Sequence, residues 1–177
     1  MVNVNDEKFK QIYLKYRTSL DVSGKRMTKL VNNLMDISKI EMNTLVPHFH
    51  NYQVIQLLQD VTAIISAHPC CESVSIKFQT DINQHLLKCD GSMIERILCN
   101  LLSNAIKFSS PSTTITVRTL IEEEWFVLEV QDEGIGITSI DQSLIFERFV
   151  QVDKSLTRIN EGIGMGLYMV KSLVSLH

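Results

Sequence analysis

The sequence predicts an α+β fold that is preceded by one long helix. A heptad pattern runs through the first 41 residues, and further along the chain helical apolar periods are mixed with alternating, strand-like segments. The 177 residues suffice for one ordinary domain plus a helical extension, and 45% apolar with 21% charged residues is typical of a chain that folds. We therefore expect two parts, residues 1–45 and 46–177.

The long helix is predicted by apolar positions that recur alternately four and three residues apart. A helix of this length, about 50 Å at 1.5 Å per residue, cannot bury such a seam without partner helices. Val31, Met35 and Ile40 widen the apolar face, which favours a bundle over a two-stranded coil. The alternative is a core helix packed on its own domain. The seam consists of Phe9, Tyr13, Tyr16, Leu20, Ser23, Met27, Leu30, Leu34, Ile37 and Glu41, and it is broken only at Ser23 and at its end.

The first half of the second part predicts a helix, a strand and a second helix. A linker near Val46-Pro47 ends the long helix, and residues 51–67 then have one apolar helical face. Val74, Ile76 and Phe78 alternate with polar residues, as in a half-buried strand. The second helix is expected to begin at about Ser92.

The second half predicts a hairpin, an irregular stretch and a final helix. Residues 115–121 and 125–130 are strand-like and flank the acidic run from Glu122 to Glu124, which we interpret as a solvated turn. Residues 137–161 have little periodicity, and loops of this length are usually functional or mobile. The last helix is expected from about Gly166.

Composition limits the classes of function. A net charge of −3 and a pI near 5.9 give no broad attraction for nucleic acid or anionic membranes, so we expect no nucleic-acid partner. Apolar runs are far shorter than the ~20 residues that span a bilayer, and no signal peptide is visible, so a cytoplasmic, soluble chain is expected. Reduced, structural thiols are expected at the four cysteines, which lack Cys-x-x-Cys spacing: Cys70, Cys71, Cys89 and Cys99.

Two amides and an ammonium follow one line of the second predicted helix. Asn100 and Asn104 are four residues apart and Lys107 follows three residues later, beside an apolar stripe that faces a core. Such a row is often only the solvated face of an amphipathic helix. Two downstream glycine clusters, residues 132–136 and 162–167, weaken that interpretation because they follow in the order that a nucleotide site requires.

Four ordered motifs resemble the ATP-binding domain of sensor histidine kinases, in the Bergerat-fold group that also includes gyrase-type and chaperone ATPases. The resemblance covers nearly the whole chain and implies a two-layer α/β sandwich that binds ATP and Mg²⁺. Residues 24–41 likewise resemble the second helix of the kinase dimerisation bundle. The motifs are Asn100-Leu-Leu-Ser-Asn104-Ala-Ile-Lys107-Phe108, Asp132-Glu-Gly134-Ile-Gly136, Phe146-Glu-Arg148-Phe149 and Gly162-Ile-Gly164-Met-Gly166-Leu167.

The resemblance implies a role for each of the first two motifs. Asp132 would accept a hydrogen bond from the adenine amino group, and Gly134 and Gly136 would let the backbone approach the ring. Alone, this Asp-x-Gly-x-Gly would be interpreted as a plain turn. Asn100 and Asn104 would bind Mg²⁺ through their side-chain oxygens. Lys107 would contact phosphate, and the adjoining Phe108 is expected at the nucleotide.

The last two motifs are expected at the triphosphate. Amides of Gly162, Gly164 and Gly166 would surround it, with the following helix directing its positive end there, and Leu167 is expected at the nucleotide. Phe146 and Phe149 would anchor an ATP lid, although simple packing also explains both. Arg148 is a candidate catalytic phosphate contact. Two further cations, Lys154 and Arg158, fall in the same lid, but surface solvation is the better expectation for them.

Asn100 favours a kinase over a hydrolase. In the gyrase and chaperone branches a glutamate at this place activates water, and an amide cannot accept that proton at neutral pH. The resemblance thus implies transfer of the ATP γ-phosphoryl to a histidine. Two alternatives stay open. One is a nucleotide-sensing binding module, and the other is a serine kinase of the anti-sigma type, which the heptad helix disfavours.

Two parts of the family pattern are missing from the chain. None of its histidines (His48, His50, His68, His85 and His177) has the acidic neighbour and later proline of a phosphoacceptor, so the acceptor is expected outside the chain. Relatives also continue beyond Leu176-His177 into closing strands. The implied partners are a second copy, once the first bundle helix is present, and a response regulator receiver domain. Any inner-membrane anchor is expected in regions outside this chain.

Overall fold

The computed structural model describes residues 4–151 and 164–177, and the chain divides into two units between Val46 and Pro47. The first unit consists of the predicted long helix, α1 (Val4–Glu41), which has 38 residues. Several seam residues are largely exposed, with Phe9 and Leu20 each at 72% and Met27 at 66%. An apolar seam of a helix this long is thus open to a partner.

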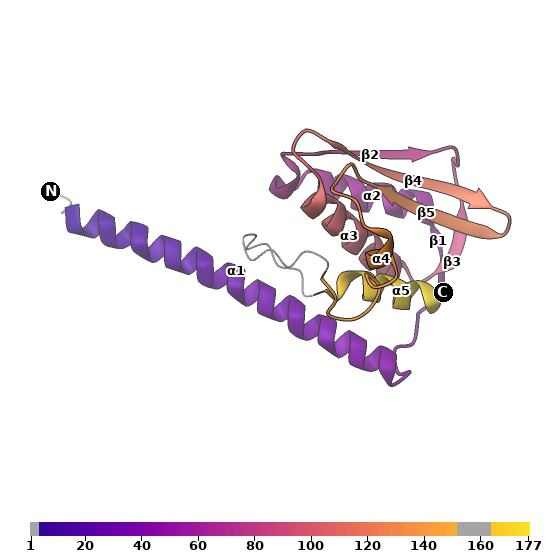
Figure 1. Ribbon diagram of the computed structural model, residues 1–177, viewed down its shortest axis with the longest axis horizontal. Helices are drawn as coiled ribbons and strands as arrows, with labels where there is room; N and C mark the ends of the chain where they lie inside the picture. Colours follow the sequence, from indigo (N-terminus) through magenta and orange to yellow (C-terminus); the bar gives the residue numbers. More distant parts are fainter. Residues whose placement is uncertain (1–3, 152–163) are drawn as a thin grey trace. The chain divides into compact units, whose positions relative to one another are not determined.

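The second unit is a mixed sheet covered by helices. Its central sheet has the order β2-β4-β5, with β4 parallel to β2 and antiparallel to β5, and β1 pairs with β3 in a separate antiparallel ribbon. Helices α2 and α3 lie on one face of the central sheet (Figure 1), and α5 packs on α3. This arrangement confirms the predicted α+β class. The elements are β1 (His50–Gln53), α2 (Val54–Ser66), the 3₁₀ turn η1 (Pro69–Cys71), β2 (Ser75–Thr80), β3 (Leu86–Cys89), α3 (Gly91–Phe108), β4 (Thr114–Glu122), β5 (Trp125–Gln131), α4 (Ser139–Gln142) and α5 (Gly166–Ser175).

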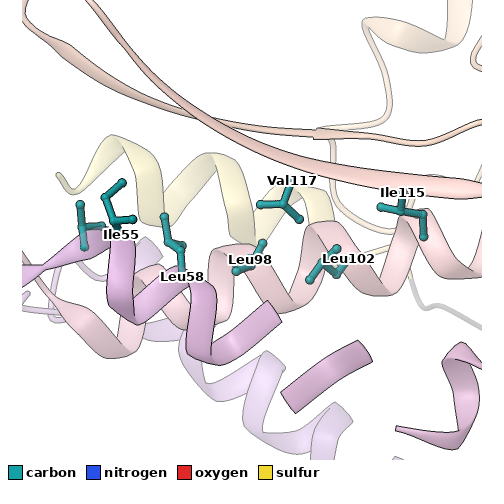
Figure 2. Packing of buried hydrophobic residues seen from close by; sticks show 8 residues of the cluster. Ile55, Leu58, Leu98, Leu102, Ile115 and Val117 are labelled. Atoms are coloured by element: carbon teal, nitrogen blue, oxygen red, sulfur yellow. The ribbon is translucent and has the colours of Figure 1, made fainter. Parts of the chain in front are cut away.

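The core forms between β4 and the two covering helices. Ile115 and Val117 are two residues apart on β4, so both point to the same face of the sheet. They pack in one cluster with Leu58 of α2 and with Leu98 and Leu102 of α3, all fully buried (Figure 2). Burial of each such side chain contributes about 1.5–3 kcal/mol. The cluster therefore fixes α3, the helix that carries the asparagines, against the sheet.

Asp90 joins three distant parts of the second unit. It is the N-cap of α3, where its Oδ1 accepts from the amide of Met93 at 3.2 Å and from the hydroxyl of Ser92 at 2.8 Å. Its Oδ2 accepts from the amide of His48 at 2.9 Å, and its own amide donates to Nε2 of His177 at 3.2 Å. The segment after Pro47 and the end of α5 are thus both bonded to the start of α3.

The electrostatic state of Asp90 follows from these contacts. Burial works against ionisation of the carboxyl, yet the hydrogen bonds from His48, Ser92 and Met93 outweigh it and hold the pKa of Asp90 below its ordinary value. The adjacent thiol responds in the opposite direction, because burial and the negative charge of Asp90 raise the pKa of Cys89. An ionised carboxylate is therefore built into the start of α3.

One predicted boundary is wrong, and four short elements were not predicted: β1, η1, β3 and α4. The helix expected from residue 51 begins at Val54, because residues 50–53 form β1 and pair with β3, from His50 opposite Cys89 to Gln53 opposite Leu86. The ribbon has four residues on each side, too few for a periodic signal. The four-residue α4 also lies in the stretch expected to be irregular.

β5 forms one edge of the central sheet. Among residues 4–151 and 164–177, β5 is paired only with β4, so its other edge presents unpaired backbone groups. Over those same ranges, no helix combines the length and the apolar character needed to cross a membrane.

Candidate functional site

The second half of α3 presents the polar row that the sequence predicted. Asn100 and Asn104 are half-buried and Lys107 is exposed. The side-chain amide nitrogen of Asn100 donates to the carbonyl oxygen of Arg96 at 3.0 Å, one turn earlier. Because the nitrogen is engaged in this way, the oxygen Oδ1 is the group that Asn100 presents outward.

The start of α5 lies beside both asparagines. A Cβ placed on Gly166 would lie 3.6 Å from Oδ1 of Asn100 and 3.8 Å from Nδ2 of Asn104, which is ordinary contact distance. Gly166 has no positive φ, so neither its backbone nor its packing requires glycine. The missing side chain instead leaves space between two amides and the positive end of a helix. That space and the Asn100 oxygen suit a metal-bound phosphate.

Gly134 holds the aspartate motif against the end of α3. The amide of Gly134 donates to Oδ1 of Asp132 at 2.9 Å, and Gly134 forms an isolated bridge with Ser109. A Cβ on Gly134 would lie 2.5 Å from the carbonyl oxygen of Phe108, closer than any real contact. Only glycine permits this approach. Asp132 is exposed, and its Oδ2 has no hydrogen-bond partner within the described residues, so it is available to a ligand.

The second glycine motif packs on the segment that ends at Val150. Gly164 has a φ of 70°, and its carbonyl oxygen accepts from the amide of Phe149 at 2.9 Å. An added Cβ on Gly164 would lie 2.6 Å from the carbonyl oxygen of Val150. Gly136 also has a φ of 70°, without any close neighbour. Glycine is therefore required at Gly164 by its positive φ and by the close approach of Val150, and at Gly136 by its positive φ alone.

Arg148 lies beside the first turn of α5. Its guanidinium carbon lies 5.5 Å from the ring centroid of Tyr168, two residues beyond Gly166. Phe146 is half-buried, whereas Phe149 is 60% exposed and has a φ of 62°. The packing explanation thus fits Phe146 better than Phe149.

Of the remaining predicted site residues, some lie within the described ranges and others lie outside them. The ammonium of Lys107 lies 4.7 Å from the ring centroid of Phe108, and Leu167 is a half-buried residue in the first turn of α5. Gly162, Lys154 and Arg158, and with them residues 152–161 of the expected lid, lie outside the described residues.

Two residues at the site were missed from the sequence. The ring of Tyr168 lies beneath the guanidinium of Arg148, and a guanidinium nitrogen of Arg96 lies 3.8 Å from Sδ of Met169, which joins α3 to α5. The i+4 spacing of Arg96 and Asn100 could have suggested the contact between them. No local sequence pattern indicates the contact of Tyr168, because its partner Arg148 is 20 positions away in sequence.

Gly166, the first residue of α5, and Gly164, two residues before it, should respond differently to replacement by alanine. In Gly166→Ala, the methyl group fits but fills the space beside Asn100 and Asn104, so affinity for Mg-ATP should fall about tenfold, or ~1.4 kcal/mol. Its melting temperature should not fall, because alanine favours helix over glycine by about 0.5–1 kcal/mol.

Gly164→Ala is the matched contrast. Its positive φ alone costs about 1–2 kcal/mol with a side chain present, and the close approach to Val150 adds to this cost. Thermal unfolding should therefore show a lower melting temperature. Calorimetric affinities that are unchanged in Gly166→Ala would remove the start of α5 from the nucleotide site.

Comparison with known proteins places this geometry in a family. The family described as histidine kinase-, DNA gyrase B-, and HSP90-like ATPase matches residues 89–177. The circadian input-output histidine kinase CikA of Thermosynechococcus vestitus is 33% identical over 164 residues, which cover 92% of this chain and 22% of that relative. The sensor histidine kinase WalK of Bacillus subtilis is 33% identical over 156 residues, which cover 86% of this chain and 25% of that relative.

A solved structure agrees on the fold. The crystal structure of full-length ShkA in complex with AMPPNP matches with a TM-score of 0.79 and 23% identity, over 92% of this chain and 33% of that one. This chain thus spans a quarter or less of the length of CikA and WalK. It belongs to the family of histidine kinase-, DNA gyrase B- and HSP90-like ATPases.

Proposed function

We propose that this chain binds Mg-ATP and directs its γ-phosphoryl to a histidine that lies outside the chain. The observation that carries the proposal is the outward-facing oxygen of Asn100 beside the open start of α5. It supplies a ligand for the metal and no base for water, since an amide does not accept a proton at neutral pH. Support also comes from the relatives, which are histidine kinases.

The residues of the site have separate tasks in this proposal. Oδ2 of Asp132 accepts from the adenine amino group, and Asn100 and Asn104 offer oxygens to Mg²⁺. Bound Mg²⁺ would neutralise charge on the phosphates. Lys107 and Arg148 stabilise negative charge that develops on the transferred group. The first turn of α5 adds the positive end of a helix at the phosphates.

The proposed partners follow from α1 and from the reaction. The exposed seam of α1 is suited to a helical bundle in which a second copy takes part. The phosphorylated histidine would then pass its phosphoryl group to an aspartate on a response regulator receiver domain. A nucleotide-sensing module, the second candidate, would use the same site without transfer.

Transfer to an external histidine gives a direct test. Incubated alone with labelled ATP, the chain should incorporate no phosphohistidine and should hydrolyse ATP very slowly. With an added protein that supplies an acceptor helix, acid-labile phosphate should appear on that protein. The substitution Asn100→Asp should reduce the transfer rate. The control is Glu95→Gln, on the exposed side of α3, which should leave that rate unchanged.

Each outcome distinguishes one class of function from the others. Stable label on any of the five histidines would overturn the external acceptor, and fast hydrolysis would favour the ATPase branch. Tight ATP binding without transfer to any acceptor helix would support the sensing module.

A further inference from the structure

Two adjacent cysteines, between α2 and β2, have no part in the nucleotide site. They lie in η1, which follows His68, whose ring Nδ1 accepts from the amide of Cys70 at 3.2 Å. The Sγ atoms of Cys70 and Cys71 are 3.6 Å apart. Cys70 is exposed and Cys71 is buried. The two sulfurs are thus held side by side at a place that solvent reaches through Cys70.

A direct disulfide is a poor fit for this pair. A disulfide requires sulfurs about 2.05 Å apart and a Cα separation that is usually at least about 4.4 Å. Adjacent Cα atoms across a trans peptide are only about 3.8 Å apart. The sulfurs of Cys70 and Cys71, 3.6 Å apart, are at the contact distance of two unbonded thiols, and one atom between them could bond to both.

The number of ligands selects the kind of atom that fits between the sulfurs. Structural zinc takes four protein ligands. Across the described ranges, no group of three or more His, Cys, Asp or Glu side chains is placed to hold a metal ion. The pair therefore offers two soft sulfur ligands without a third, which matches a thiophilic acceptor with two valences to exchange.

We propose that Cys70 and Cys71 form a bidentate thiol site for monosubstituted trivalent arsenicals. An organoarsenic oxide reacts with both thiols: two As–S bonds form, the As–O double bond breaks, and the oxygen leaves as water with the two thiol protons. Arsenic stays trivalent, so no electrons are exchanged with the protein. The third arsenic valence keeps its organic group, which can extend into solvent on the exposed side of Cys70.

The order of the two steps follows from the environments of the thiols. Burial, the hydrogen bond with Cys70 and the charge of Cys70 raise the pKa of Cys71 to about 11, so Cys71 is protonated at neutral pH. The exposed Cys70 forms the first As–S bond, because the arsenical reaches its sulfur directly from solvent. Cys71 then closes the ring, and its S–H no longer donates to the carbonyl oxygen of Ile65, now at 3.1 Å.

Phenylarsine oxide is the probe that tests the site. Intact-mass spectrometry of the full chain should show one adduct per chain, with loss of one water. Cys70→Ser should weaken binding roughly 100-fold, because the second sulfur no longer acts at high effective concentration. Cys99→Ser, which changes the other exposed cysteine, should bind as the parent does. Excess 2,3-dimercaptopropanol should remove the adduct, and excess 2-mercaptoethanol should not.

Three results would overturn the proposal: full affinity in Cys70→Ser, loss of the adduct in Cys99→Ser, or removal by the monothiol as easily as by the dithiol. Cys70 is exposed, so its serine variant should fold, and circular dichroism checks this. Cys71→Ser changes a buried position and serves only as a second variant. The measurement needs no nucleotide and stands apart from the proposed kinase activity.

Discussion

Replacing Asp132 with asparagine should weaken ATP binding roughly 10- to 100-fold, because hydrogen bonds to charged groups contribute about 1.5–3 kcal/mol. The asparagine side chain has the same shape as the aspartate side chain that it replaces. Its side-chain oxygen can still accept from the amide of Gly134, which now bonds to Oδ1 at 2.9 Å, so the turn should be kept. The substitution changes only the free Oδ2, which becomes an amide nitrogen. This nitrogen is a donor, so it cannot accept the hydrogen bond from the adenine amino group. Isothermal titration calorimetry measures the loss.

Nucleotide selectivity provides the control for this change. Guanine presents an oxygen where adenine presents an amino group, so Asp132→Asn should lower the preference for ATP over GTP as well as the ATP affinity. Glu133→Gln removes the neighbouring exposed charge and should leave both unchanged. Equal ATP affinity in Asp132→Asn and the parent would refute the assignment of Asp132 to the base.

Replacing Asp90 with alanine should destabilise the second unit by about 2–4 kcal/mol. Loss of an N-cap costs about 0.5–2 kcal/mol, and the amide of His48, 42 positions away, loses its acceptor at a further cost of about 1–3 kcal/mol. Urea unfolding monitored by circular dichroism measures the change. Asp81→Ala alters an exposed aspartate of the same unit and should be near neutral.

The cost of Asp90→Ala should depend on pH in one direction. The folded pKa of Asp90 lies below its unfolded value, near 3.8, so its ionisation stabilises the fold above that pH. This contribution is lost as the pH falls from about 4 through the lowered folded pKa. The difference between parent and Asp90→Ala should therefore be largest at neutral pH and shrink at pH 3. A constant difference would assign the loss to packing and not to charge.

Sequence patterns predicted the elements whose signals are local. The heptad seam predicted α1, and the alternation of Val74, Ile76 and Phe78 predicted β2. The apolar stripe of α3 predicted both that helix and the face on which Asn100 and Asn104 lie. These features depend on a residue and its neighbours within one or two turns, which is why a single sequence shows them.

The features that sequence patterns missed depend on distant partners. The residues of β1 are polar apart from Tyr52, and they form a strand only because they pair with residues of β3 that lie 33 to 39 positions later. The contact between Gly166 and Asn100, and that between Arg148 and Tyr168, likewise join separate motifs. The motif order predicted that these residues belong to one site, but not which atoms face each other.

The bond between His48 and Asp90 also determines how the second unit would respond to mechanical load. A pull applied to the chain at Pro47 acts first on the amide of His48 and hence on the carboxylate of Asp90, before it reaches the sheet. From there it passes into α3, an 18-residue rod about 27 Å long at 1.5 Å per residue. Asn100 and Asn104 are on the far half of that rod. In a single-molecule stretching experiment, the first rupture should therefore be release of the segment after Pro47, at a lower force in Asp90→Ala.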